Sequence, residues 1–314
     1  MLLIGRRLVQ AIPVLFGTVM LTFVIASVLP GNITGSILGE NASPEAVVQL
    51  EQRLGLNQPV LARFWDYFTS LLRGDFGQSL RTDESVLPMV LDRLWISVQL
   101  MVFGQVFALA LAIAFASLSI RKPGGFVERF TSVLASAAIS IPTFLFGIVL
   151  ILVFAVHWKI FPAVGFTPLT DDVGKYFRSM VLPTVTLGFV EFAVYFRVLQ
   201  SETHQIMAED YVTTARAKGL SKGRIGRSHI LRNSLFPLIT VVGLNVGRLL
   251  GGSVIVESIF AIPGMGRLMV DAIGARDLPV VQGVVLFVAL GYVVANLAVD
   301  LLYAVIDPRL RHGS

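Results

Sequence analysis

Six long apolar stretches constrain this chain more than any other feature of its sequence. They lie near residues 8–29, 95–119, 131–157, 180–202, 235–258 and 280–305. A helix needs about 20 apolar residues to cross the roughly 30 Å of hydrocarbon in a bilayer, and each stretch is long enough. Because the bilayer core offers no water to backbone amides and carbonyls, such stretches must be helical. The sequence therefore predicts an all-α, polytopic membrane protein with six transmembrane helices.

Composition agrees with a membrane protein. Only 14% of the residues are charged, against about 25% in ordinary soluble domains. The chain has no cysteine, which excludes disulfides, thiolate catalysis and cysteine metal sites. The formal charge of +5 is explained by basic cytoplasmic loops and does not require a nucleic-acid partner.

The N-terminal segment begins like a signal peptide, because the basic pair Arg6 and Arg7 precedes an apolar run. However, the apolar run ends in Leu29-Pro30-Gly31 without a small-x-small cleavage site. We therefore expect a retained first span whose N-terminus is cytoplasmic.

Positive charge orients the predicted helices. Basic residues gather before the first span, between the second and third, between the fourth and fifth, and after the sixth. They are Arg6, Arg7, Arg121, Lys122, Arg129, Lys218, Lys222, Arg224, Arg227, Arg232, Arg309 and Arg311. In an alternating six-helix arrangement all of them fall on one side, which the positive-inside rule makes cytoplasmic. Both termini are therefore expected inside a bacterial cytoplasmic (inner) membrane.

Two long connections divide the chain into segments. We predict an N-terminal transmembrane helix over 1–30, an external subdomain over 31–93 and a transmembrane core over 94–310, with a cytoplasmic loop over 203–234. In the external segment, Ser43-Pro44-Glu45 opens a helix that ends at Gly55.

A second external helix is expected around four aromatic side chains. They are Phe64, Trp65, Tyr67 and Phe68. These side chains suit the subdomain's own core or an interfacial anchor better than a ligand-binding box.

The cytoplasmic loop carries the most specific local pattern. Glu209 and Asp210 open a short helix, where carboxylates complement the helix dipole. Gly219 supplies the left-handed residue that ends it, and Ser221 is placed to cap the next helix. A short helix with small residues and a fixed corner suits insertion into a partner's groove. The alternative is a basic loop that rests on anionic lipid headgroups.

This loop resembles the EAA motif of ABC importer permeases. Thr213, Thr214 and Ala215 occupy the positions of the family's Glu-Ala-Ala triplet, and Gly219 occupies its glycine position. Two features depart from the general motif: Thr213 and Thr214 replace its acidic residue and first alanine, and the interval from Gly219 to Pro237 is longer. Both departures resemble the dipeptide, oligopeptide and nickel transporter branch of the family. That branch commonly reads Thr-Ala-Arg-Ala-Lys-Gly-Leu, which matches Thr214 to Leu220.

Further segments along nearly the whole chain resemble the same branch. They are Leu54-Gly55-Leu56 with Pro59, Gly74-Asp75-Phe76-Gly77 with Ser79, His229 with Leu231-Arg232-Asn233, Pro263-Gly264-Met265-Gly266-Arg267, Ala275 to Gln282, Asp300 to Tyr303 and Asp307-Pro308-Arg309.

The resemblance implies a non-catalytic permease subunit of an importer. Its partners would be a second homologous permease, two ABC ATPase subunits and an extracytoplasmic solute-binding protein, with ATP and Mg²⁺ bound by the ATPases. This chain contains no G-x-x-x-x-G-K-(S/T) sequence, which fits ATP hydrolysis by a partner. The residues expected to dock the ATPase are Asp210, Tyr211, Thr214, Ala215, Arg216, Ala217, Lys218, Gly219 and Leu220.

Ionisable residues at membrane depth form the second candidate site, because such groups usually face a bundle interior or a water-filled path. Glu191 lies in the fourth stretch, and Asn245 and Arg248 lie one turn apart in the fifth. Their opposite chain directions place Glu191 and Arg248 at similar depth. We expect these residues either to line the translocation path or to form an interhelical ion pair.

Alternatives of other classes are weaker. A self-sufficient secondary transporter would use Glu191 for ion coupling, but it leaves the loop unexplained and no inverted repeat is evident. An intramembrane hydrolase lacks H-E-x-x-H and G-x-S-x-G motifs. If the chain is an importer subunit, its sequence does not specify the solute. Short peptides are favoured because they dominate the branch. Nickel, glutathione or another small solute is the alternative.

Overall fold

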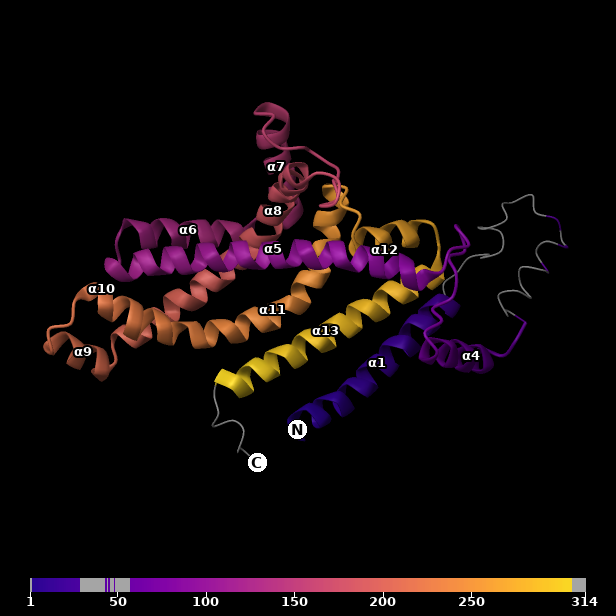
Figure 1. The fold of residues 1–314 in the computed structure, drawn as a ribbon, viewed down its shortest axis with the longest axis horizontal. Helices are drawn as coiled ribbons and strands as arrows, with labels where there is room; N and C mark the ends of the chain where they lie inside the picture. The colour runs from indigo at the N-terminus through magenta and orange to yellow at the C-terminus, as the bar shows by residue number, and fades with distance from the viewer. Residues whose placement is uncertain (1, 29–42, 44, 46–47, 49–56, 307–314) are drawn as a thin grey trace. The chain divides into compact units, whose positions relative to one another are not determined.

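The computed structural model describes residues 2–28, 43, 45, 48 and 57–306, and every regular element in them is a helix (Figure 1). The helices run in this order: α1 Leu2–Val28, α4 Val60–Leu72, α5 Val86–Arg121, α6 Phe126–Ser140, α7 Thr143–Leu150, η1 Ile151–His157, α8 Val173–Met207, α9 Asp210–Ala217, α10 Lys222–Ile225, η2 Gly226–Leu231, α11 Arg232–Ile259, α12 Met265–Gly274 and α13 Leu278–Ile306. The all-α prediction is thus confirmed for the described part of the chain.

Five helical segments are long and apolar enough to cross a membrane. They are Val9–Ser27, Val86–Arg121, Val173–Met207, Lys222–Ile259 and Leu278–Val299. A sixth span results only if the bent pair α6 and α7–η1 is counted as one. Large apolar side chains such as Ile12, Trp95 and Val133 are exposed on these helices, as expected where the surrounding medium is lipid.

The predicted third span is broken at Pro142. Helix α6 ends at Ser140 and α7 begins at Thr143, and the two pieces are bent by 108°. Proline lacks an amide hydrogen and disfavours helical backbone in the residue before it, and Ile141 is indeed extended. The sequence predicts a kink at this proline; the structure has a much sharper turn, so 131–157 is not one straight helix.

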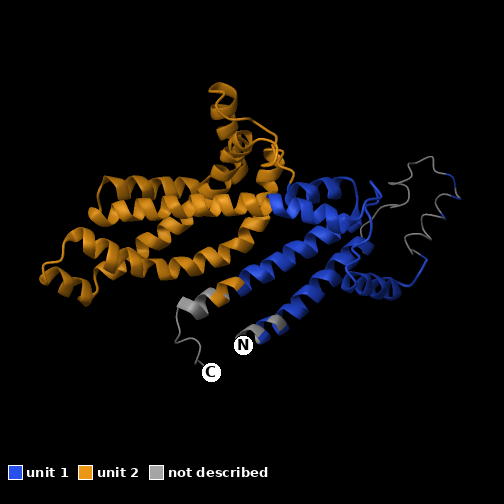
Figure 2. Cartoon of the chain, viewed as in Figure 1, with its two compact units in different colours: residues 1–96, 264–297 blue, residues 97–263, 298–314 orange. Residues whose placement is uncertain are grey.

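Two compact units group the helices (Figure 2). Unit 1 comprises residues 1–96 and 264–297, and unit 2 comprises residues 97–263 and 298–314. The segment boundaries predicted from the sequence remain predictions.

In unit 2, α5, α6, α8 and α11 enclose a core of alanine and aromatic side chains. The fully buried members include Ala108, Ala112, Phe192, Tyr195 and Phe196. Small residues allow close helix packing in membranes. One close approach to backbone joins α5 to α8: a Cβ atom added to Gly188 would lie 2.6 Å from the Gly104 carbonyl oxygen.

In unit 1, the aromatic side chains of α4 pack on α1. Phe64 lies edge-on to Phe16 and Phe23, and Tyr67 stacks on Phe23. Burial raises the pKa of the Tyr67 phenol. The aromatics expected around residues 64–68 therefore hold α4 against the first apolar helix. The other helix predicted in this region, between Pro44 and Gly55, falls largely outside the described residues.

The Gly104–Gly188 contact yields a stability prediction. In Gly188→Ala the added methyl meets backbone, which cannot move aside like a side chain, so we expect a loss of about 1–3 kcal/mol, typical of overpacking. The measurement is the fraction of monodisperse protein after heating in detergent. Gly251→Ala is the control, because its added Cβ meets no atom within 4 Å; equal behaviour of the two variants would contradict the close approach.

Candidate functional site

The predicted loop at 203–234 is folded into short helices. Helix α9 covers Asp210–Ala217, with Asp210 in its first turn. It ends at Gly219, whose φ of +78° is the predicted left-handed conformation. Ser221 occupies the N-cap position of α10, but its side chain makes no capping hydrogen bond. The turn between α9 and α10 therefore depends on Gly219 more than on Ser221.

The loop has a small hydrophobic core. Its buried members are Val212, Ala215, Ile225 and Ile230, and the half-buried side chains packed on them are Ile120, Ile206, Met207 and Leu220. These residues come from the end of α5, the end of α8, helix α9 and the segment that leads into α11. The core thus attaches α9 to the ends of α5 and α8 and to the segment that leads into α11.

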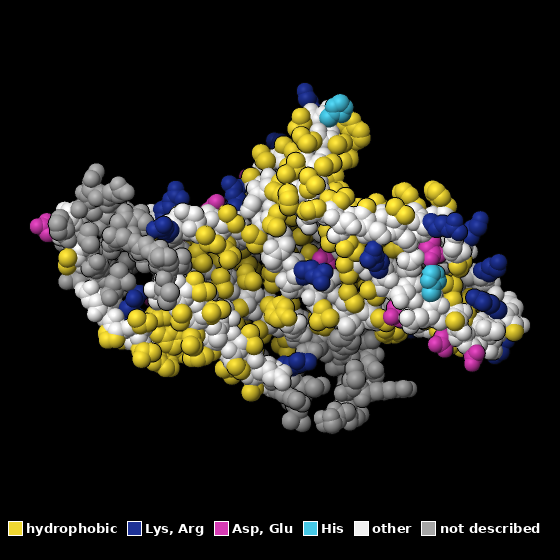
Figure 3. Space-filling view, turned by 180° about the vertical axis from the view of Figure 1, so that it is seen from behind, with side chains coloured by type: hydrophobic (Ala, Val, Ile, Leu, Met, Phe, Trp, Pro, Cys, Tyr) yellow, Lys and Arg dark blue, Asp and Glu magenta, His cyan; other side chains and the backbone are white. Residues whose placement is uncertain are grey.

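The core divides the predicted docking residues into two groups. Ala215 is 7% exposed and faces the core, and Leu220 is half-buried. The side facing away from the core is formed by the exposed residues Asp210, Tyr211, Thr214, Arg216, Ala217, Lys218 and Gly219. In Figure 3, Lys and Arg side chains gather at the end of unit 2 that carries α9 and α10. We call these seven residues the α9 outer face.

A hydrogen bond also ties the α9 outer face to α11. The Asn233 side-chain amide donates to the Tyr211 hydroxyl at 2.9 Å. The Tyr211 ring lies 6.4 Å from the His229 ring, centroid to centroid. The start of α11 and helix α9 are thereby connected through polar as well as apolar contacts.

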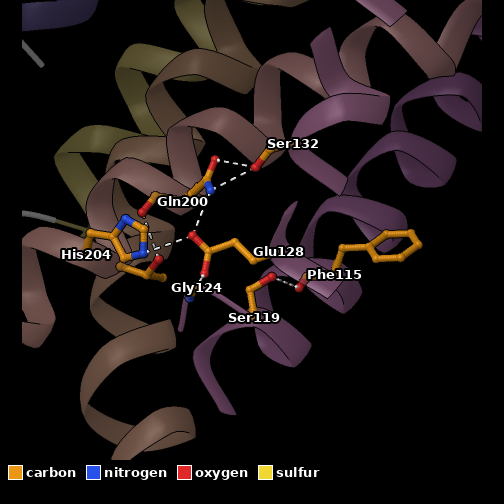
Figure 4. A network of polar contacts seen from close by, with 8 residues as sticks. Phe115, Ser119, Gly124, Glu128, Ser132, Gln200 and His204 are labelled. Atoms are coloured by element: carbon orange, nitrogen blue, oxygen red, sulfur yellow. Dashed lines mark hydrogen bonds and ion pairs between the residues drawn. The ribbon is translucent and has the colours of Figure 1, made fainter. Parts of the chain in front are cut away.

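Near the same end of unit 2, a buried carboxylate joins α6 to α8 (Figure 4). Glu128, 6% exposed, accepts hydrogen bonds from the Gly124 backbone amide at 2.8 Å and the Gln200 side-chain amide at 2.9 Å. His204 Nε2 lies 3.1 Å from the same carboxylate. Gln200 also donates to Ser132 of α6. These contacts hold the last turns of α8, just before α9, in one position.

We expect Glu128→Ala to destabilise the protein, because it removes the buried carboxylate that accepts from Gly124 and Gln200 and lies beside His204. The expected cost is about 1–3 kcal/mol, measured as lower thermal resistance of the purified protein. Glu202→Ala is the matched control, since it removes a carboxylate from the same end of α8 and none of these hydrogen bonds. A Glu128→Ala protein as heat-resistant as the control would contradict this role.

The second candidate site is a polar cluster inside the helix bundle. The Asn245 side-chain amide of α11 donates to Glu191 of α8 at 2.6 Å, and the two side chains are 4% and 3% exposed. Tyr195, one turn after Glu191, is a further hydrogen-bond partner of that carboxylate. The Gln105 amide of α5 donates to the Tyr195 hydroxyl at 2.7 Å. The cluster therefore connects three helices.

Arg248 lies at the edge of this cluster. Its side chain is exposed, and its charge interacts with Glu191. However, no ion pair within 4.0 Å joins these two residues, both of which the structure describes. Asn245, and not Arg248, makes the direct contact with Glu191.

Several members of these networks are absent from the sequence-based list. Gln105 and Tyr195 are polar residues within apolar stretches, whereas Glu128 and Gln200 stand next to other polar residues. The spacing of Glu191 and Tyr195, four residues apart, could have indicated a shared helix face. Nothing in the sequence pairs Glu128 with α8, because that contact depends on the tertiary packing. Among the described residues, no group of three or more His, Asp or Glu side chains is placed to hold a metal ion.

Comparison with known proteins places this chain in a family. Residues 96–312 match the family described as binding-protein-dependent transport system inner membrane component, and residues 1–101 match the N-terminal family of the same transport-system membrane components. The chain belongs to this family of inner-membrane permeases. The predicted family and membrane location are thereby confirmed.

Individual relatives are similar over nearly their entire length. The dipeptide transport system permease protein DppB of Alkalihalophilus pseudofirmus is 36% identical, with 98% of each chain covered. The glutathione transport system permease protein GsiC of Salmonella typhimurium is 38% identical, again with 98% of each covered. A probable peptide ABC transporter permease of Sinorhizobium fredii is 35% identical over 98% of each chain. The predicted branch is thus confirmed.

Proposed function

We propose that this chain is the permease subunit of an ATP-driven importer and forms half of the translocation path for short peptides. The observation that carries the proposal is the attachment of α9, through one hydrophobic core, to the ends of α5 and α8 and to α10 and η2, which lead into α11. Because tightly packed side chains transmit displacement, a force applied to the α9 outer face would reach the ends of three long helices.

The proposed assembly contains this chain, a second homologous permease, two ATPases and an extracytoplasmic solute-binding protein. The ATPases bind ATP and Mg²⁺ and dock on the α9 outer face. Nucleotide binding shifts the population between inward-open and outward-open arrangements, since it stabilises one of them more. Six spans with both termini in the cytoplasm agree with the basic residues beside α9 and at the end of α5.

Short peptides are the proposed solutes. Relatives along the full length are named for dipeptide, peptide and glutathione transport, and glutathione is itself a small peptide. Nickel complexes or another small solute are the alternative within this function. A secondary transporter is disfavoured because it gives α9 no role.

The docking proposal predicts the effect of a bulky residue on the α9 outer face. Ala217 is exposed, so Ala217→Trp leaves the loop core intact while obstructing a close partner. We expect at least a tenfold loss of co-purified ATPase, which corresponds to about 1.4 kcal/mol. Lys122→Trp adds the same side chain at an exposed position between α5 and α6 and should leave recovery unchanged.

Two outcomes would contradict the proposal. Full ATPase recovery with Ala217→Trp would remove the α9 outer face from the contact. A chain that purifies alone and transports in vesicles without ATP would overturn the importer itself and favour a secondary transporter.

The polar cluster yields a separate prediction for the path. Glu191→Gln keeps the shape of the side chain and removes its charge. If the carboxylate lines the path for a charged solute, we expect uptake to fall roughly tenfold or more while ATPase co-purification stays normal. Normal uptake by a normally assembled complex would exclude a path role and leave Glu191 with its interhelical contacts alone.

A further inference from the structure

One face of α11 is exposed along the second half of the helix. Leu244, Arg248, Gly251 and Ile255 are all exposed, and their spacing of four, three and four residues places them on the same side of an α-helix. Helix α11 and its neighbour α8 both belong to unit 2 (Figure 2). We call these four residues the α11 exposed face.

A positive charge lies far from both ends of the helix on this face. Helix α11 runs from Arg232 to Ile259, so Arg248 is about 16 Å or more from either end at a rise of about 1.5 Å per residue. An arginine side chain bends toward the headgroups only near the end of a span. Because a guanidinium in hydrocarbon is costly, such groups face a bundle interior or a water-filled path. The α11 exposed face therefore borders a polar space and not lipid.

The buried polar cluster beside Arg248 leaves its guanidinium available. The Glu191 carboxylate already accepts from the Asn245 amide at 2.6 Å and has Tyr195 as a further partner. Among the described residues, none lies within 4.0 Å of Arg248 as an ion pair or accepts a hydrogen bond from its side chain. The five N–H donors of a guanidinium can therefore meet a ligand.

Glu191 influences Arg248 from a longer distance. Its negative charge attracts the guanidinium, which offsets part of the cost of holding a cation at this depth. The same attraction weakens any contact that Arg248 makes with an anion. A transient contact of this kind suits a path, because a solute that is held too tightly is not released.

Gly251 leaves room beside Arg248. A Cβ atom added to Gly251, about one turn after Arg248, would meet no atom within 4 Å. A glycine at such a position lets the backbone of a ligand approach closely. A charged group and an adjacent space of this kind fit the end of an extended chain.

A carboxylate is the group that this arginine recognises best. The planar guanidinium presents paired N–H donors that match the two oxygens of a carboxylate. A linear peptide carries one at its C-terminus whatever its side chains are. One arginine can therefore serve peptides of many sequences.

We propose that Arg248 binds the terminal carboxylate of a peptide as the peptide passes along the translocation path. The proposal rests on the importer function and adds the residue of this chain that contacts the solute. Glu191 is a positioning residue, since it acts through Arg248 and Asn245 and is itself buried.

The first test measures ATP-driven uptake by the assembled transporter in proteoliposomes with its solute-binding protein. The probe is radiolabelled tri-alanine. We expect Arg248→Gln to lower uptake roughly tenfold or more, while Arg248→Lys, which keeps the charge, retains more uptake than Arg248→Gln. Gly251→Leu keeps the arginine and fills the adjacent space, so it should also lower uptake. Arg178→Gln is the control, because it makes the same substitution at an exposed position near the start of α8.

The second test measures the Kd of the transporter without its binding protein for tri-alanine and for tri-alanine amide, which lacks the carboxylate. We expect the wild type to prefer the acid roughly tenfold or more and Arg248→Gln to lose this preference. Equal affinity of the wild type for both probes would overturn the assignment of the carboxylate.

The outcomes separate this inference from the importer function. Wild-type uptake by Arg248→Gln would overturn the inference and leave the importer standing. Loss of the second permease from purified Arg248→Gln would also overturn it, because Arg248 would then belong to the contact between the two permeases. Absence of ATP-driven tri-alanine uptake by the wild type would overturn both the inference and peptide import.

Discussion

The need to satisfy every backbone amide and carbonyl within lipid governs this molecule. A bilayer core provides no competing water, so a chain that crosses it must close its hydrogen bonds within helices. With the backbone satisfied locally, contacts between helices depend on close packing and on a few polar pairs. The Gly104–Gly188 contact and the Glu191–Asn245 hydrogen bond are examples of these two mechanisms.

The same constraint explains how much of the fold the sequence could predict. Apolar stretches of membrane length are visible without tertiary information, and five of the predicted spans overlap long apolar helices. The left-handed Gly219 and a kink at Pro142 were also predictable, because both follow from the local chemistry of one residue. The angle at Pro142 was not, since packing around the break sets it.

The candidate sites were predictable in part. The position of α9 followed from acidic residues before it and a glycine after it, but the inward direction of Ala215 depends on Ile225 and Ile230, which follow later in the chain. Glu191 was visible as a charge in an apolar stretch. Its contact with Asn245 in place of Arg248 depends on the rotation of α11 against α8, and periodicity alone does not determine that rotation.

The crossing of α5 and α8 has a geometric consequence. Gly188 lies close to the middle of α8, so the helix extends roughly 20 to 30 Å on either side of this contact. Gly104 and Gly188 let the backbones of α5 and α8 come into contact, so this crossing is a point about which α8 could tilt. Any tilt of α8 about it moves the two ends in opposite directions by similar distances. In such a tilt, α8 would act as a lever with nearly equal arms, which would reverse the direction of a displacement without enlarging it.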